Sequence, residues 1–196
     1  MKKIIVVALF AIVSCSRNTE KPLTAGTDSI QANANAFLTL SKGKQMYVKY
    51  ESEIDLNHVK RITTTGGVSI YMAPFIGDTT KIYAVNTLGK EILYVAQMKN
   101  KKNGRIGLMK DGEAIVIEVT DGKNQIHDTG GNEFQARFAG KYHGGNGFCQ
   151  RRKGESFAAC FRAESDEFCD SFISCVALAT QPTVVIVIGL ACSCNA

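Results

Sequence analysis

Residues 81–119, KIYAVNTLGKEILYVAQMKNKKNGRIGLMKDGEAIVIEV, decide the fold class. In this stretch, short runs of β-branched and aromatic residues alternate with turn residues, a pattern typical of neighbouring β-strands. In the last run, Ile115, Ile117 and Val119 recur at every second position, which places them on one face of a strand. The pattern also extends toward the N-terminus, and it predicts six strands at 45–50, 68–73, 81–86, 91–97, 105–110 and 113–119.

The dipeptides between these runs are turn signals. Asp111-Gly112 and Asp121-Gly122 are preferred in tight hairpins, and Asn103-Gly104 marks another turn. Because no long helical pattern separates the strands, the sheet should be mainly antiparallel. We therefore expect an α+β protein, in which a β-rich domain at residues 44–128 precedes a disulfide-rich helical C-terminal segment.

The composition is that of a globular protein without a strong charge bias. Of the 196 residues, 45% are hydrophobic and 21% are charged. When Lys2 and Lys3 are set aside, 21 basic residues face 18 acidic ones, an excess too small to indicate nucleic acid as a partner. There is no Gly-rich phosphate loop and no G-x-S-x-G motif, so we expect no cofactor and favour a non-enzymatic role.

The first 14 residues have the pattern of an export signal. Lys2 and Lys3 precede an apolar run that ends at Cys15 and is too short to span a bilayer. The residues I-V-S-C at 12–15 resemble the lipobox of bacterial lipoproteins, in which the peptidase cuts before the cysteine and its sulfur carries diacylglycerol. The resemblance implies a lipid on Cys15 and a place on a membrane of the cell envelope, facing the periplasm or the exterior. The alternative is an ordinary secretory signal in which Cys15 has no special role.

Residues 15–43 would then form a lipid anchor and a tether. The stretch 16–29 is polar and contains one Pro and one Gly, which is typical of a linker. Residues 29–40 predict a short helix capped by Thr27 or Asp28.

Three features of the middle region contain residue types that occur in functional sites. His58 and His127 lack a spaced partner that would make a metal-ligand pair. The acidic segment 51–55, ESEID, lacks the spacing and the glycine of a Ca²⁺ loop, and a solvated turn is the favoured interpretation. The basic cluster at 99–105 is compatible with anionic lipid or phosphate, but a charged hairpin end is favoured.

The remaining cysteines follow a Gly-rich connector at 129–148. An even number of cysteines in an exported chain predicts disulfides, and a zinc site is the alternative, although the closely spaced cysteine pairs typical of zinc are missing. No metal is therefore expected. The predicted disulfide cysteines are Cys149, Cys160, Cys169, Cys175, Cys192 and Cys194.

The segment after Gly154 has a helical pattern of about six turns. Its apolar stripe consists of Phe157, Phe161, Phe168, Phe172, Cys175 and Ala179. If this helix is continuous, Cys160, Cys169 and Cys175 lie too far apart to pair with one another. Each would then pair with Cys149, Cys192 or Cys194, which leaves six of the fifteen possible connectivities.

The end of the chain, QPTVVIVIGLACSCNA at 181–196, is strongly apolar from Val184 to Leu190. Three interpretations compete. This strand or short helix folds back on the amphipathic helix and is held there by disulfides, or residues 172–192 span a membrane, or the segment is a membrane-active hairpin. The first is favoured, because so short an apolar run fits a buried element and not a membrane span.

Residues 141–149, KYHGGNGFC, resemble the start of pediocin-like bacteriocins, small secreted peptides that insert into target membranes. This resemblance implies a membrane-active peptide or toxin in the C-terminal third. The function we expect first is different: an exported lipoprotein that is anchored through Cys15 and acts as a non-enzymatic binding or envelope-structural module with an envelope or surface protein as its partner. We also expect that reduction loosens residues 149–194 and leaves the β-rich part folded.

Overall fold

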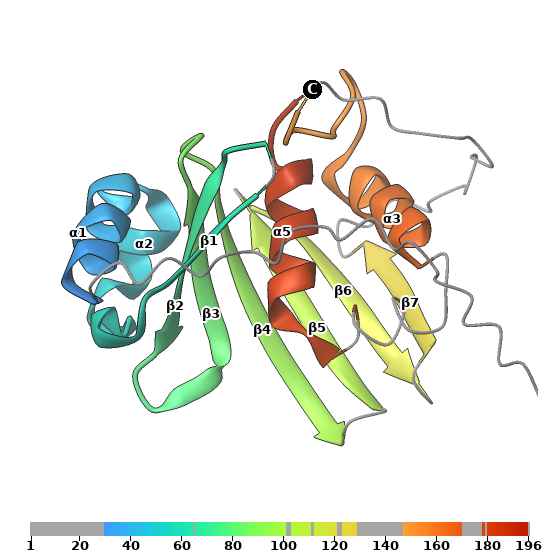
Figure 1. The fold of residues 1–196 in the computed structure, drawn as a ribbon. Helices are drawn as coiled ribbons and strands as arrows, with labels where there is room; N and C mark the ends of the chain where they lie inside the picture. The colour runs from blue at the N-terminus through green and yellow to red at the C-terminus, as the bar shows by residue number, and fades with distance from the viewer. Residues whose placement is uncertain are drawn as a thin grey trace, which may run out of the picture.

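The computed structural model describes residues 30–64, 66–100, 103–110, 112–120, 123–128, 147–169, 178 and 180–195, with the backbone alone described for 123–128. Helices come first in these residues, a sheet follows, and helices end the chain (Figure 1). This order confirms the predicted α+β class. Cys15, Cys175 and most of the Gly-rich connector lie outside the described residues.

The described part of the chain contains one sheet of seven strands in sequence order, and each neighbouring pair is antiparallel. The strands are β1 (Lys60–Thr63), β2 (Ser69–Phe75), β3 (Asp78–Asn86), β4 (Glu91–Asn100), β5 (Asn103–Lys110), β6 (Glu113–Thr120) and β7 (Lys123–Asp128). β1 and β7 were not predicted, because KRIT and KNQIHD are short and mostly polar. Their place is fixed by pairing with a neighbour, not by an apolar face of their own.

The turn between β4 and β5 is displaced from its predicted position. Asn100 pairs with Asn103, so Asn103 and Gly104 belong to β5 and are not turn residues. Gly104 is required for a different reason. A Cβ atom there would lie 2.6 Å from the Cα of Met98 and 2.7 Å from the carbonyl oxygen of Gln97.

The strand predicted at 45–50 is wrong, because these residues form the helix α2 (Gln45–Tyr50). A strand would have placed Met46, Val48 and Tyr50 on one buried face. Instead Val48 is 63% exposed and Tyr47 is buried, which is the spacing of a helix that touches the core on one side. The β-branched and aromatic composition of QMYVKY was overridden by tertiary packing.

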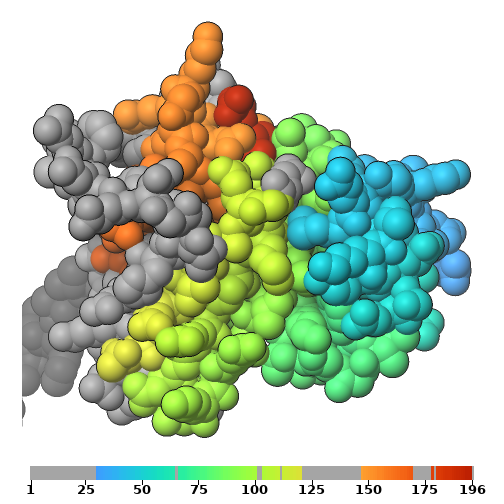
Figure 2. All heavy atoms as spheres, turned by 180° about the vertical axis from the view of Figure 1, so that it is seen from behind, coloured from blue at the N-terminus to red at the C-terminus, as the bar shows by residue number. Residues whose placement is uncertain are grey.

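The first face of the sheet is covered by the N-terminal helices. These are α1 (Ile30–Ser41), which confirms the helix expected at 29–40, then α2 and the short 3-10 helices η1 (Glu51–Glu53) and η2 (Leu56–His58). Phe37 of α1 packs edge-on against Tyr47 of α2 and Tyr83 of β3. Figure 2 shows that α1 and α2, in blue and cyan, occupy one side of this view, with atoms of β4–β6 visible beside them.

The second face is covered by α3 (Phe157–Phe168) and α5 (Pro182–Cys192), which lie in front of the sheet in Figure 1. Val185, Ile186 and Leu190 of α5 share one core with Ile92 of β4 and Leu108 of β5. The contact is closest at Gly189, where an added Cβ would collide with the side chain of Ile92. The C-terminal helices therefore complete the core of the sheet and do not build a separate one.

The predicted six-turn helix is interrupted. α3 ends at Phe168, and the backbone N–H of Cys169 closes the last turn by donating to the carbonyl of Ser165. Phe157 and Phe161 are buried as predicted, but Phe168 is 36% exposed. Phe172, Cys175 and Ala179 lie outside the residues whose side chains are described.

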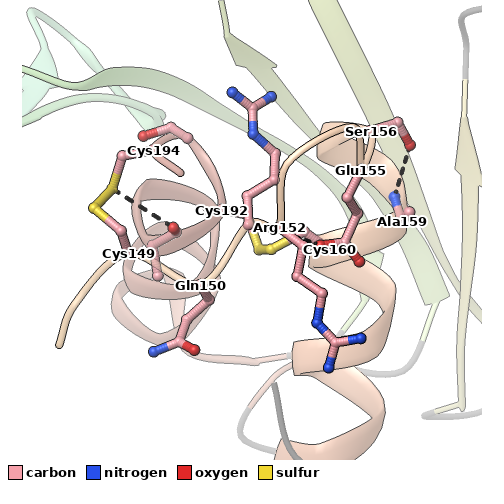
Figure 3. The surroundings of a disulfide bond; sticks show 12 residues. Cys149, Gln150, Arg152, Glu155, Ser156, Ala159, Cys160, Cys192 and Cys194 are labelled. Carbon is pink, nitrogen blue, oxygen red and sulfur yellow. Dashed lines mark hydrogen bonds between the residues drawn. A yellow bond between two sulfur atoms is a disulfide. The ribbon is translucent and has the colours of Figure 1, made fainter. Parts of the chain in front are cut away.

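Two disulfides link the C-terminal elements, Cys149–Cys194 and Cys160–Cys192 (Figure 3). Cys169 is disulfide-bonded as well. The six predicted connectivities are wrong, since each would have joined Cys149 to a cysteine of the long helix. Because that helix is not continuous, its spacing does not restrict the pairing. Cys149 meets Cys194 because the chain at Gln150 donates a hydrogen bond to the carbonyl of Ala191 at the end of α5.

The apolar tail is helical and is packed on the sheet and α3, with Cys160–Cys192 joining α3 to α5. This is the fold-back arrangement favoured from the sequence. Among the helices of the described residues, none has the length and apolar character needed to cross a membrane.

Candidate functional site

A groove lies on the second face of the sheet, at the first turn of α5. It consists of two adjacent hollows of about 450 Å³ each, which share Thr79 and Pro182. We call them together the α5 groove. The hollow toward β2 is walled by Met72, Pro74 and Ile82, and the hollow toward β4 by Tyr94, Ala96 and Met98.

The groove exists because α5 begins part of the way along the strands. Pro182, at the first helical position, has a fixed φ that suits a helix start and no N–H to leave unpaired. β4 continues past this first turn (Figure 1), so Ala96 and Met98 are only partly buried, whereas Ile92 is fully covered. Small side chains at Ala96 and Thr79 leave the space unfilled.

Tyr94 contributes a phenol to the wall of the groove, beside polar side chains such as Thr80 and Asn100. Its side chain is only 4% exposed, and within the described residues its hydroxyl makes no hydrogen bond. Burial raises the pKa of Tyr94 to about 12, so the phenol stays protonated at neutral pH. The phenol oxygen is not one of the buried side-chain atoms without a partner in the described residues, so its hydroxyl is accessible from the hollow and can donate to a ligand or to water there.

The rim toward β1 carries charge. Asp55 accepts hydrogen bonds from the backbone N–H of Asn57 and from the ring of His58, the latter over 2.7 Å. His58 therefore has a carboxylate partner that the sequence spacing did not indicate. Lys60 lines the same hollow.

The acidic segment predicted as a solvated turn is a 3-10 turn with exposed Glu51 and Glu53, followed by Asp55 as the cap of η2. The described residues contain no group of three His, Cys, Asp or Glu side chains that could hold a metal ion. The side chain of His127 lies outside the described residues.

The pair Asp55–His58 has the orientation of a carboxylate and an imidazole in hydrolases. That chemistry also needs a nucleophile within hydrogen-bond reach of the ring. His58 is 71% exposed, and no hydroxyl in the described part of the chain is hydrogen-bonded to it. The geometry of the rim therefore fits recognition of a ligand better than nucleophilic catalysis.

Asp78 stands at the start of β3, next to Thr80 of the groove. The hydroxyl of Thr80 and then its backbone N–H donate to Asp78, and they lower the pKa of its carboxyl. Lys81 forms an ion pair with the same carboxylate. The negative charge of Asp78 is thus largely satisfied within β3.

A larger hollow lies elsewhere, at the end of the β4–β5 hairpin, with a volume of about 920 Å³. It includes Lys99 and Arg105 of the predicted basic cluster, and Lys101 and Lys102 fall outside the described residues. Arg105 forms an ion pair with Glu118 at 2.8 Å, in which the Arg105 side chain is exposed and the Glu118 side chain is partly buried. Its walls are mostly polar and charged, unlike those of usual small-molecule pockets.

A second buried phenol lies under α1. The hydroxyl of Tyr83 donates to Glu91 over 2.6 Å, and both residues are buried. Burial, followed by the hydrogen bond and the charge of Glu91, raises the pKa of Tyr83 well above its ordinary value. Because each group satisfies the other and neither lines a hollow described above, we assign this pair to the stability of the fold.

Comparisons with protein-family models, with curated proteins and with solved structures return no match for this chain. Among the described residues, the α5 groove is the feature whose geometry points to a function. Tyr94 was not singled out from the sequence. The signal is contained in the run EILYVAQ at 91–97. Ile92, Tyr94 and Ala96 share one face of this strand, and along that face a large apolar side chain is followed by a phenol and then by a small side chain.

Proposed function

We propose that this chain is an exported, lipid-anchored protein whose folded part is a non-enzymatic binding module for a small, largely apolar ligand. The observation that carries the proposal is the α5 groove. Its hollows have the size of small-molecule sites, and they combine apolar walls with a few polar groups, as such sites do.

The anchoring part rests on the sequence. The basic start, the apolar run and I-V-S-C at 12–15 support a lipid on Cys15, and the polar stretch 16–29 would give the folded part reach from the membrane. More than one acyl chain would hold the protein stably on a bilayer. A binding module placed this way meets ligands that lie near the membrane surface.

The bacteriocin-like alternative requires the apolar tail to leave the protein. In this fold Val185, Ile186 and Leu190 are fully buried against the sheet, and Cys160–Cys192 ties α5 to α3. Releasing α5 would expose both its own apolar surface and that of β4 and β5. This arrangement favours the binding module.

Binding is tested with the neutral fluorescent probe N-phenyl-1-naphthylamine and the purified, oxidised chain. We expect saturable fluorescence enhancement, and at least a tenfold weaker affinity when Ala96→Phe fills the hollow. Thr79→Phe, an exposed residue shared by both hollows, should weaken binding without disturbing the core. Val48→Phe adds the same side chain to the exposed face of α2 and should leave binding unchanged. Equal affinity in all four proteins would contradict the proposal.

Anchoring is tested separately by fractionating a bacterial host that produces the full chain. The wild type should be in the membrane fraction with a mass of residues 15–196 plus acyl chains. Cys15→Ser should release it. A wild type that lacks acyl mass would remove the lipid anchor and leave the binding proposal standing.

A further inference from the structure

We propose that the ligand of the α5 groove is a small carboxylate with an apolar body, held by its carboxylate at Tyr94. The inference rests on the proposed binding function and names its ligand class. It combines the mostly buried Tyr94, whose phenol lines the hollow without a hydrogen bond to the described residues, with the N-terminus of α5 and apolar walls.

Tyr94 is the hydrogen-bond donor of the proposed site. Tyr94 lies on β4 between Ile82 of β3 and Leu108 of β5 in the sheet register, and its side chain lines the hollow. Tyr83, a buried phenol on the opposite face of the sheet, donates to the carboxylate of Glu91. In the described residues no carboxylate stands in the same position for Tyr94, and an incoming carboxylate would supply the missing acceptor.

The electrostatic potential at this end of the groove also favours a negatively charged ligand. Pro182 and Thr180, at the start of the 11-residue helix α5, line the same hollow as Tyr94. Gln181, the N-cap residue, makes no side-chain capping hydrogen bond, so the positive end of the helix dipole is not neutralised by its own cap. Lys60, in the adjoining hollow, adds a positive charge.

The acidic side chains beside the groove have hydrogen-bond or ion-pair partners of their own. Asp55 accepts from the ring of His58 and from the backbone N–H of Asn57, and Asp78 forms an ion pair with Lys81 and accepts from Thr80. The apolar side chains of Ala96, Met98, Met72 and Ile82 extend from the Tyr94 end along both hollows. A ligand that matches both the Tyr94 end of the groove and these apolar walls has a carboxylate at one end and a hydrocarbon body.

The test compares octanoate with octan-1-ol, which share an alkyl chain and differ in the charged head. Calorimetric titration of the oxidised chain should show octanoate binding about tenfold or more tightly than the alcohol, as expected for a hydrogen bond to a charged group. Tyr94→Phe keeps the ring and should reduce octanoate affinity about tenfold, with little effect on octan-1-ol. Tyr71→Phe removes a buried phenol hydroxyl from the opposite face and should change neither.

Equal binding of octanoate and octan-1-ol, or an unchanged octanoate affinity in Tyr94→Phe, would overturn the carboxylate assignment. If N-phenyl-1-naphthylamine still binds and Ala96→Phe still blocks it, the binding function survives that result. If neither octanoate nor the neutral probe binds, both proposals are wrong. A thermal melt of Tyr94→Phe that matches the wild type confirms that the variant is folded.

Discussion

The two faces of the sheet are built by different means. The face under α1 and α2 is closed by large aromatic side chains, Phe37, Tyr47 and Tyr83, and its buried phenol Tyr83 has a carboxylate partner. The face under α3 and α5 is closed mainly by aliphatic side chains, together with Phe157 and Phe161 of α3, and by disulfides, and its buried phenol Tyr94 has no such partner. A cross-linked face can therefore keep an unfilled groove, because covalent links replace part of the packing.

The largest loss of unfolding free energy should come from removing an aromatic side chain from the face under α1 and α2. Phe37 is fully buried between α1, α2 and β3. Phe37→Ala should lower the free energy of unfolding by about 3–5 kcal/mol, since it removes a large side chain and leaves a cavity. Urea unfolding measures the change. Val48→Ala on exposed α2 is the matched control and should shift the free energy by less than about 0.5 kcal/mol.

A loss below about 1 kcal/mol in Phe37→Ala would contradict the role of aromatic packing on this face.

Removing the buried cross-link of the other face should have the next largest effect. The paired variant Cys160→Ala/Cys192→Ala should lose about 2–4 kcal/mol of unfolding free energy. Cys149→Ala/Cys194→Ala is the comparison, because it removes a link of similar loop length, 45 residues against 32, at the end of the chain. The loop-entropy terms of the two links are nearly equal. We therefore expect a larger loss for Cys160–Cys192, whose sulfurs lie in the core.

Hydrogen exchange on the same variants tests the shared core. The sequence alone predicted that the C-terminal segment opens by itself. Because α5 and the strands bury one common set of side chains, we now expect β4 and β5 to lose protection together with α5. Loss of protection confined to residues 149–194 would restore the earlier expectation.

The smallest expected effect is the pH dependence of stability that comes from Tyr94. Tyr94 has a folded pKa of about 12 against an ordinary 10. Its contribution to stability is therefore complete below pH 10 and is lost as the pH rises toward 12. This loss should be on the order of 2 kcal/mol. Urea unfolding between pH 9 and 12 should show a shallower decline in Tyr94→Phe than in the wild type.

Identical pH profiles would contradict the burial of a protonated phenol in the groove wall.

The sheet could be predicted from the sequence because its signal is local. Alternation at Ile115, Ile117 and Val119 and the hairpin dipeptides act over a few residues. The errors were at places decided by distant contacts. QMYVKY at 45–50 becomes a helix because Tyr47 reaches the aromatic core, and β1 is a strand because it pairs with β2.

The groove could not be predicted for the same physical reason. It depends on where α5 begins relative to β3 and β4, which are separated from it by more than 80 residues of chain. Likewise, the cysteine pairing was inferred from a helix assumed to be continuous, and α3 ends at Phe168. Local sequence patterns predicted the strands that carry the wall residues of the α5 groove, but they did not predict the space between those strands and α5.

An NMR titration of the oxidised, isotope-labelled chain with N-phenyl-1-naphthylamine tests most directly whether the cross-linked face carries the binding site. We expect chemical-shift changes at Tyr94, Ala96, Met98 and Thr183, with the amides of α1 and α2 unchanged. Shifts centred on Phe37 and Tyr47, or no saturable shifts at all, would contradict the claim that the cross-linked face carries the binding site.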